Sequence, residues 1–173
     1  MGKRLLILGA GGHGKVVREV ALSLLDISRK PVYEVVDFLD DNSEEAIGRM
    51  DDFEKYKYEY QDAFCAIGNN AIRKQLLDKA EKLGYSVPVL IHPSAYVSQS
   101  AVIEAGTVVE PKAIVNANSV IHRGSIISIG AIVDHDAVVG EYGHVNAGAI
   151  VKAGARVESG RKLEAGEVVL GYG

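Results

Sequence analysis

The stretch that decides the fold lies in the second half of the chain and includes residues 103–139, IEAGTVVEPKAIVNANSVIHRGSIISIGAIVDHDAVV. Within it and on both sides, every sixth residue is a branched aliphatic: Ile91, Val97, Ile103, Val109, Val115, Ile121, Ile127, Val133, Val139, Val145, Val151, Val157, Leu163 and Val169. A helix and a simple strand have shorter periods, so neither explains this spacing. A hexapeptide period is typical of a β-helix, in which short strands wind into stacked coils.

Two further positions of the hexad agree with this interpretation. Three residues after the aliphatic anchor the chain offers glycine at 106, 124, 130, 148, 154, 160 and 166, with Asn118 and Asp136 at two other sites. These residues tolerate the positive φ of a tight corner. Four residues after the anchor comes a small residue, which alternation places on the anchor's own inward face: Ala95, Ala101, Thr107, Ala113, Ser119, Ser125, Ala131, Ala137, Gly143, Ala149 and Ala155. Arg161 and Glu167 break this series, so we expect the last coil to act as a cap.

The outward side of the predicted β-helix is unusually apolar. The residue before each anchor should face outward, yet seven consecutive positions of this kind are aliphatic: Val102, Val108, Ile114, Val120, Ile126, Ile132 and Val138. An apolar outer surface indicates coverage by partner subunits. His144 interrupts the series with a polar side chain, as a residue at the rim of such an interface would, while Arg156 and Lys162 follow at the same position.

Bulk properties exclude several classes of protein. The chain has 173 residues, is 47% hydrophobic and carries a net charge of -4, without a basic block that would indicate nucleic-acid binding. No segment reaches the length of a membrane span, and the apolar run near the amino terminus ends in a glycine loop instead of a cleavage site. The single Cys65 lies in an apolar run and is expected in the core. We therefore expect a cytoplasmic protein.

Residues 1–86 have a different pattern and predict an α/β domain that precedes the β-helix of residues 87–173. Strands are expected at Lys3–Leu8, Val32–Leu39, Ala63–Ile67 and Val87–Ile91, and helices at Lys15–Leu25 and about residues 71–83. Residues 42–60 are polar and are expected to form a loop with a short helix. Strand–helix alternation predicts a Rossmann-like parallel sheet with its ligand beyond the carboxyl ends of the strands.

Gly9-x-Gly11-x-x-Gly14 follows the first strand and matches the dinucleotide fingerprint. Such a loop binds a pyrophosphate at a helix N-terminus. Because a UDP-sugar and NAD both contain a pyrophosphate, the motif leaves a sugar-nucleotide protein and an NAD enzyme open. A tight turn that binds no ligand is a third interpretation.

Taken together, several motifs resemble one family. They are GAGGHGKVV at residues 9–17, FLDD at 38–41, AIGNN at 66–70, LIHPSA at 90–95 and the hexads that follow. They resemble the sialic-acid O-acetyltransferase and bacillosamine-type amino-sugar N-acetyltransferase family, over nearly the whole chain. The resemblance implies a homotrimer of left-handed β-helices with three hexads per coil. It also implies a sugar nucleotide such as a UDP-amino-sugar in the first domain, and acetyl-CoA as co-substrate along the β-helix.

His135 and Asp136 are the candidate catalytic residues. On the residues alone, His135 is either an exposed corner histidine or a general base whose imidazolium Asp136 stabilises. The resemblance favours the base and places both residues in the family's catalytic stretch. Many relatives have Glu at the place of Asp136, which leaves open whether the shorter side chain reaches His135.

The resemblance also assigns binding residues. It implies acetyl-CoA contacts at His144, Ala153 and Ala165, with the backbone amide near Ala153 as an oxyanion donor. It implies Gly11, Gly12 and His13 in the phosphate loop, Asp40 and Asp41 at the nucleoside end, and Gly68 facing the sugar. Without it, His13 and the two aspartates are equally a helix start and a solvated turn. The histidines show no metal-ligand spacing, so we expect no metal, and His92 and His122 are interpreted as structural.

The sequence thus predicts N-acetylation of a nucleotide-linked 4-amino-sugar by direct attack of its amine on the thioester. O-acetylation of sialic acid, a non-catalytic sugar-nucleotide-binding trimer and an NAD-dependent enzyme remain open. The identity of the sugar, the base and the acetylated position does not follow from the residues.

Overall fold

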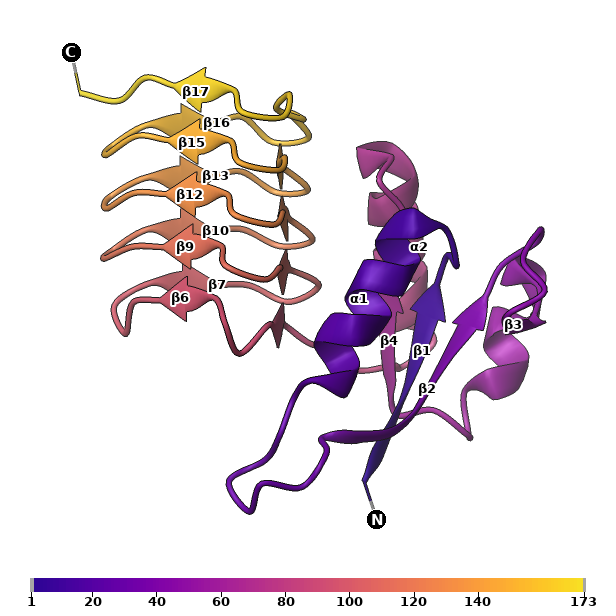
Figure 1. Ribbon diagram of the computed structural model, residues 1–173. Coiled ribbons are helices and arrows are strands. Elements are labelled where there is room, and N and C mark those ends of the chain that lie inside the picture. Colours follow the sequence, from indigo (N-terminus) through magenta and orange to yellow (C-terminus); the bar gives the residue numbers. More distant parts are fainter. Residues whose placement is uncertain (1, 173) are drawn as a thin grey trace. The chain divides into compact units, whose positions relative to one another are not determined.

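A computed structural model describes residues 2–172, which form two compact units divided between Pro88 and Val89. This is two residues after the boundary expected from the sequence. The first unit is an α/β domain and the second is a left-handed β-helix of hexapeptide repeats (Figure 1).

The first unit contains a parallel sheet with strand order β3-β2-β1-β4. Its elements in chain order are β1 (Lys3–Leu8), α1 (Gly12–Leu22), β2 (Tyr33–Leu39), β3 (Ala46–Gly48), the 3₁₀ helix η1 (Met50–Tyr56), β4 (Asp62–Cys65) and α2 (Asn70–Lys82). The last four residues of β1 are fully buried, and α1 packs against β1 and β2 while α2 packs against β4. Cys65 is fully buried, and desolvation raises its thiol pKa to about 12, as expected of a core thiol.

Two expectations for the first unit are wrong. The polar stretch 42–60 contains a fourth strand of the sheet, β3, as well as η1; β3 pairs with the end of β2 and is too short to show a period. No sheet strand spans Val87–Ile91: Ser86 makes one bridge to Asp62, and only Leu90–Ile91 is a strand, β5, which belongs to the β-helix. The helices also begin and end slightly earlier than predicted.

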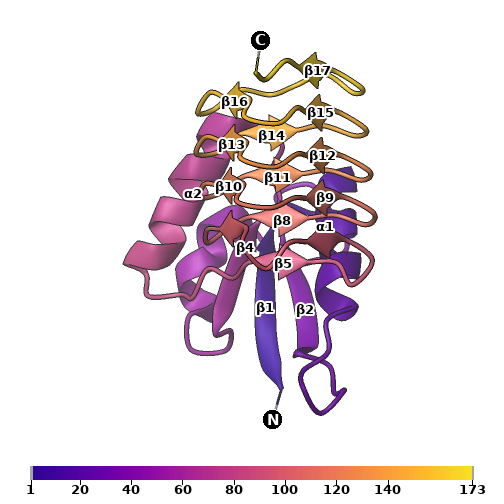
Figure 2. The ribbon, with the colours of Figure 1, turned by 90° about the vertical axis from the view of Figure 1, so that its left-hand side faces the viewer.

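In the second unit, two-residue strands stack into three parallel sheets (Figures 1 and 2). The strands after β5 are β6 (Tyr96–Val97), β7 (Val102–Ile103), β8 (Val108–Val109), β9 (Ile114–Val115), β10 (Val120–Ile121), β11 (Ile126–Ile127), β12 (Ile132–Val133), β13 (Val138–Val139), β14 (His144–Val145), β15 (Ile150–Val151), β16 (Arg156–Val157) and β17 (Val168–Val169). Val120 pairs with Val138 and Val138 pairs with Arg156, so each coil takes three hexads. The three-hexad coil is confirmed.

The predicted interior of the β-helix is also confirmed. The anchors from Val109 to Leu163 are fully buried, and small partners such as Ala131 and Ala137 fill the space between them. The corner glycines, Asn118 and Asp136 have positive φ, and two corners without a predicted signal, Lys112 and Tyr142, do as well. Arg161 and Glu167 pair through a contact of 2.6 Å between Nη2 and Oε1, near the carboxyl end of the described chain.

The outward positions are only partly as expected. Val102 is exposed and Val120 and Val138 are half-buried, but Val108, Ile126 and His144 in the sheet β14-β11-β8-β5 are buried. The period of six determines which side of a strand faces the interior, and it contains no information on whether the other side is covered.

Candidate active site

His135 lies on the corner that joins β12 to β13. Asp136 has the positive φ, 57°, that this corner requires, and its short side chain turns back toward the preceding residue. His135 Nδ1 and Asp136 Oδ2 are 2.7 Å apart, so aspartate does reach the imidazole. Both side chains remain about half exposed. With Nδ1–H donating to the carboxylate, the lone pair of the neutral ring is on Nε2 and is available to a substrate.

The preceding coil holds the two aspartates that flank His135. Asn118 Nδ2 donates to Asp136 Oδ1 over 3.3 Å, and Asn116 Nδ2 donates to Asp134 Oδ1 over 3.0 Å. The hydrogen bond with Asp136, and then the charges of both aspartates, raise the pKa of His135 above its ordinary value. The bond with His135 and the bond from Asn118 lower the pKa of Asp136. The pair therefore strengthens the imidazole as a base while Asp136 stays ionised.

One coil above His135, the backbone N–H of Ala153 has no acceptor within residues 2–172. At comparable corners an Asx side chain takes the next amide: Asn116 binds Ala117 N and Asn146 binds Ala147 N, both at 2.8 Å. Asp134 does the same for His135 N at 2.7 Å. Residue 152 is lysine, which has no acceptor oxygen, so the Ala153 N–H stays available to a ligand.

This N–H borders a cavity of about 230 Å³ lined by Asp134, Lys152, Ala153, Gly171 and Tyr172. The cavity is thus lined on one side by Asp134, the residue that precedes His135. Sequence reasoning singled out neither Lys152 nor Tyr172. For Lys152 a signal was present, because it departs from the Asx residues that stand at positions 116, 134 and 146.

The other predicted acetyl-CoA contacts do not share this corner. His144 is only 8% exposed, and its Nε2 lies 3.0 Å from Ser128 Oγ, which argues against a rim residue. Ala165 is exposed, but it stacks above Ala147, whose carbonyl accepts from Gly166 N over 2.9 Å. That corner lies between β14 and β15. The structure therefore brings His135, Asp136 and Ala153 together, and places His144 and Ala165 elsewhere on the coils.

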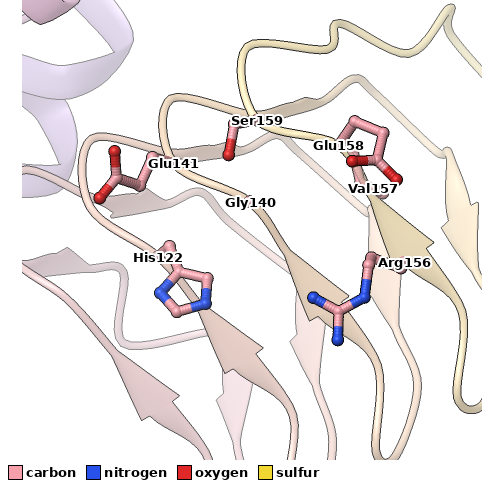
Figure 3. A pocket seen from close by; sticks show the side chains of 7 residues that line it. All are labelled: His122, Gly140, Glu141, Arg156, Val157, Glu158 and Ser159. Carbon is pink, nitrogen blue, oxygen red and sulfur yellow. The ribbon is translucent and has the colours of Figure 1, made fainter.

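A second imidazole–carboxylate pair provides a comparison. His122 Nδ1 lies 3.1 Å from Glu104 Oε1, and the side chain borders a cavity of about 270 Å³ on another corner (Figure 3). Arg156, Glu141, Glu158 and Ser159 also line it. Glu104 is engaged first by the Arg123 backbone N–H, at 2.9 Å, and this bond is the largest cause of its lowered pKa. Glu104 thus holds the corner as well as the ring, which fits a structural role for His122.

In the first unit, the glycine loop between β1 and α1 is exposed at Gly11 and Gly12. Gly9 has φ +104°, and a Cβ on Gly14 would lie 2.1 Å from the Gly9 carbonyl oxygen, so both glycines serve the turn itself. A Cβ on Gly11 or Gly12 would meet nothing within 4 Å. Internal packing therefore does not explain these two glycines, whereas a ligand approaching the N-terminus of α1 would.

Asp40, at the end of β2, braces that loop. Its Oδ2 accepts the Ala10 N–H and its Oδ1 accepts the Asn42 N–H, both at 2.8 Å. The bond from Ala10, followed by that from Asn42, lowers the pKa of the carboxyl. The predicted nucleoside contact at Asp40 is therefore also a support of the phosphate loop. Asp41 Oδ1 accepts the Met50 N–H at 3.2 Å.

The remaining predicted substrate residues flank the carboxyl ends of β1 and β4. His13 lies in the first turn of α1, directly after the open Gly12. Gly68 follows β4, and a Cβ there would also meet open space. Buried Arg73 supports this second loop, since its Nη1 donates to the Ile67 carbonyl at 2.9 Å. Among residues 2–172, no group of three or more His, Cys, Asp or Glu side chains is arranged to hold a metal ion. No helix in the described chain is long and apolar enough to cross a membrane.

Comparisons with known proteins agree with this architecture. Residues 4–80 match the PglD N-terminal domain family. The chain is 37% identical to the acetyltransferase domain of PglB from Neisseria gonorrhoeae, solved with acetyl coenzyme A; the match covers 97% of this chain and 82% of that one, with a TM-score of 0.87. PerB from Caulobacter crescentus, solved with CoA and GDP-perosamine, is 28% identical over 97% of this chain and 89% of its own, with a TM-score of 0.79.

Among curated proteins, the UDP-N-acetylbacillosamine N-acetyltransferase of Bacillus subtilis is 36% identical over 104 residues, which are 57% of this chain. The match spans about half of that relative, 47% of its length. An α/β unit followed by hexapeptide coils, together with these relatives, defines the class of hexapeptide-repeat sugar acetyltransferases. Within that class, the chain belongs to the sialic-acid O-acetyltransferase and bacillosamine-type amino-sugar N-acetyltransferase family.

Proposed function

We propose that the protein transfers the acetyl group of acetyl-CoA to the amine of a nucleotide-linked amino-sugar, with a UDP-4-amino-sugar as the first candidate. The observation that carries the proposal is the corner at which a carboxylate-supported imidazole lies one coil below an available backbone N–H. The N-acetyltransferases among the relatives, and their complexes with acetyl-CoA, CoA and GDP-perosamine, support the same reaction.

In the proposed reaction the amine nitrogen attacks the thioester carbonyl carbon directly. His135 Nε2 accepts the proton that the nitrogen loses, and Asp136 stabilises the resulting imidazolium. The carbonyl oxygen gains negative charge and accepts a hydrogen bond from Ala153 N–H. The carbon–sulfur bond then breaks and CoA leaves as the thiolate. His135 transfers its proton to the thiolate sulfur. The products are an amide and CoA thiol.

The glycine loop fits the sugar nucleotide. Its open face at Gly11 and Gly12, beside the N-terminus of α1, suits a pyrophosphate, since backbone N–H groups and the helix dipole both favour negative charge there. Asp40 holds the loop in place before the ligand arrives.

A homotrimer is part of the proposal. Two of the three sheets carry outward apolar side chains that residues 2–172 leave exposed or half-exposed: Tyr96, Ile114, Ile132, Ile150 and Val168 on one, and Val102, Val120 and Val138 on the other. Rows of this kind are typical of surfaces buried between subunits. Sedimentation equilibrium tests the assembly, and a monomer at micromolar concentration would contradict it.

The reaction is tested by CoA thiol release with acetyl-CoA and a panel of acceptors. We expect release with a UDP- or GDP-linked amino-sugar and none with its N-acetylated form. Release with sialic acid alone would indicate the O-acetyltransferase instead. Tight UDP-sugar binding without thiol release would indicate a non-catalytic binding protein, and selective NADH binding would indicate a dinucleotide enzyme.

A further inference from the structure

The corner column above Asp136 contains an aromatic ring that the core does not need. Residues 136, 154 and 172 occupy the same corner in successive coils, because each is 18 residues from the last. The backbone pattern repeats accordingly: Gly154 N donates to the His135 carbonyl at 3.0 Å and Tyr172 N donates to the Ala153 carbonyl at 3.2 Å. Tyr172 therefore lies two strand spacings, about 10 Å, above Asp136.

The Tyr172 ring packs against Gly154. A Cβ on Gly154 would lie 2.1 Å from Tyr172 Cε1 and 2.2 Å from Cζ, so the ring rests directly on the glycine backbone. Even so, Tyr172 is 72% exposed. One face of the ring thus contacts the glycine backbone, while most of its surface is open to a ligand.

The ring is also a wall of the cavity that begins at Asp134 and contains the available Ala153 N–H. Lys152 also lines the cavity and makes no ion pair within residues 2–172. The other lining residues, Ala153 and Gly171, are small. A narrow space with one N–H donor, one cation and one aromatic face suits a slender chain that contains amides and leads toward a phosphate.

We propose that Tyr172 is a positioning residue that packs against the pantetheine arm of acetyl-CoA and directs its thioester carbonyl to the Ala153 N–H. This inference rests on the proposed function, since it assigns a contact to the co-substrate of that reaction. Tyr172 touches the arm and takes no part in proton transfer.

Calorimetry of CoA binding to the full chain, without acceptor, tests the contact independently of turnover. We expect Tyr172→Ala to weaken CoA binding about three- to tenfold, as the loss of an aromatic contact implies, and Tyr172→Phe to bind like the unaltered protein. The KM for acetyl-CoA should rise with the Kd, while the affinity for the sugar nucleotide stays the same. Equal CoA affinity in Tyr172→Ala would overturn the inference and leave the proposed function standing. If the unaltered protein binds no CoA, both fail.

Two matched glycine substitutions test the position of the Tyr172 ring without altering the tyrosine itself. Gly154→Ala places a methyl group where the ring rests, whereas Gly130→Ala, at a nearly identical φ of +64° against +67°, meets nothing within 4 Å. Both carry the same backbone strain, so only Gly154→Ala should weaken CoA binding. Equal CoA affinities in the two variants would contradict a role for the Tyr172 ring, packed against Gly154, in binding CoA.

A fluorescent reporter covers the case in which Gly154→Ala does not fold. The chain contains no tryptophan, so Tyr172→Trp introduces a single one at the proposed contact. Its emission should change saturably with CoA and stay constant with the sugar nucleotide alone. Constant emission while calorimetry detects CoA binding would place the arm elsewhere.

Discussion

His135→Ala gives the most direct test of the proposed chemistry, because the β-helix supplies its own control. A positioned general base contributes about 10²–10⁴ in rate, so turnover should fall by that factor. His122→Ala removes an imidazole of similar exposure that also has a carboxylate partner, at 3.1 Å, and should leave turnover nearly unchanged. Steady-state thiol release at saturating substrates measures both variants. KM for acetyl-CoA should change little in either, since proton transfer is confined to the transition state.

The exposure of the His135–Asp136 pair limits the contribution that we expect from Asp136. The pair is about half exposed on both sides, and such ion pairs are weak, so Asp136→Asn should cost only about two- to fivefold in turnover. Its effect on the pH profile is more specific. The base must be neutral, and Asp136 raises the pKa at which His135 loses its proton. Turnover should therefore decline as pH falls through that raised pKa, and in Asp136→Asn the decline should move to lower pH.

Two results would refute this reasoning. Turnover of His135→Ala within a few-fold of His122→Ala would remove His135 from the reaction. A decline at the same pH in Asp136→Asn would show that the acid limb reports another group.

Three further predictions concern stability and the phosphate loop. Gly12→Ala should fold normally, because its methyl group enters open space, and should raise KM for the sugar nucleotide that we place in that space. Gly14→Ala should lose about 1–3 kcal/mol of stability, because its methyl group collides with the Gly9 carbonyl oxygen. Urea unfolding measures the stability of both variants, and steady-state kinetics measures KM. Ile127→Ala, in the fully buried stack, should cost about 2–5 kcal/mol of unfolding free energy, while Ile129→Ala, at a 53% exposed site, should cost little. Asp40→Asn should lose about 1 kcal/mol at neutral pH. Because the native pKa of Asp40 is lowered, its contribution is present above the unfolded pKa and disappears as pH falls through the native one, so the two proteins should converge in acid unfolding curves.

The regular part of the fold was predictable because each coil repeats one local rule. The period of six identified the buried anchors, and glycine, Asn118 and Asp136 marked corners with positive φ. The corners at Lys112 and Tyr142 carried no such signal, because neither residue type favours the positive φ that it adopts there. Strand β3 was missed because it has only three residues, too few to show a period, and it is a strand only because it pairs with the end of β2.

The candidate site divides in the same way. His135 and Asp136 stand out as residue types in a series of small corner residues, so sequence was sufficient to nominate them. The Ala153 N–H is available because Lys152, unlike Asn or Asp, has no side-chain oxygen to accept it. The position of the Tyr172 ring depends on the absence of a Cβ at Gly154, 18 residues earlier. The burial of His144 depends on the covering of its sheet, which hexad positions do not encode.

The hydrogen bond from Gly154 N to the His135 carbonyl makes the spacing of the proposed reaction centre a property of the winding itself. The backbones of His135 and Ala153 are separated by one layer, about 4.8 Å, whatever the side chains elsewhere do. Whole layers added after Tyr172 would leave this spacing unchanged. An extra layer wound between His135 and Ala153 would instead abolish it, even if every residue type were kept.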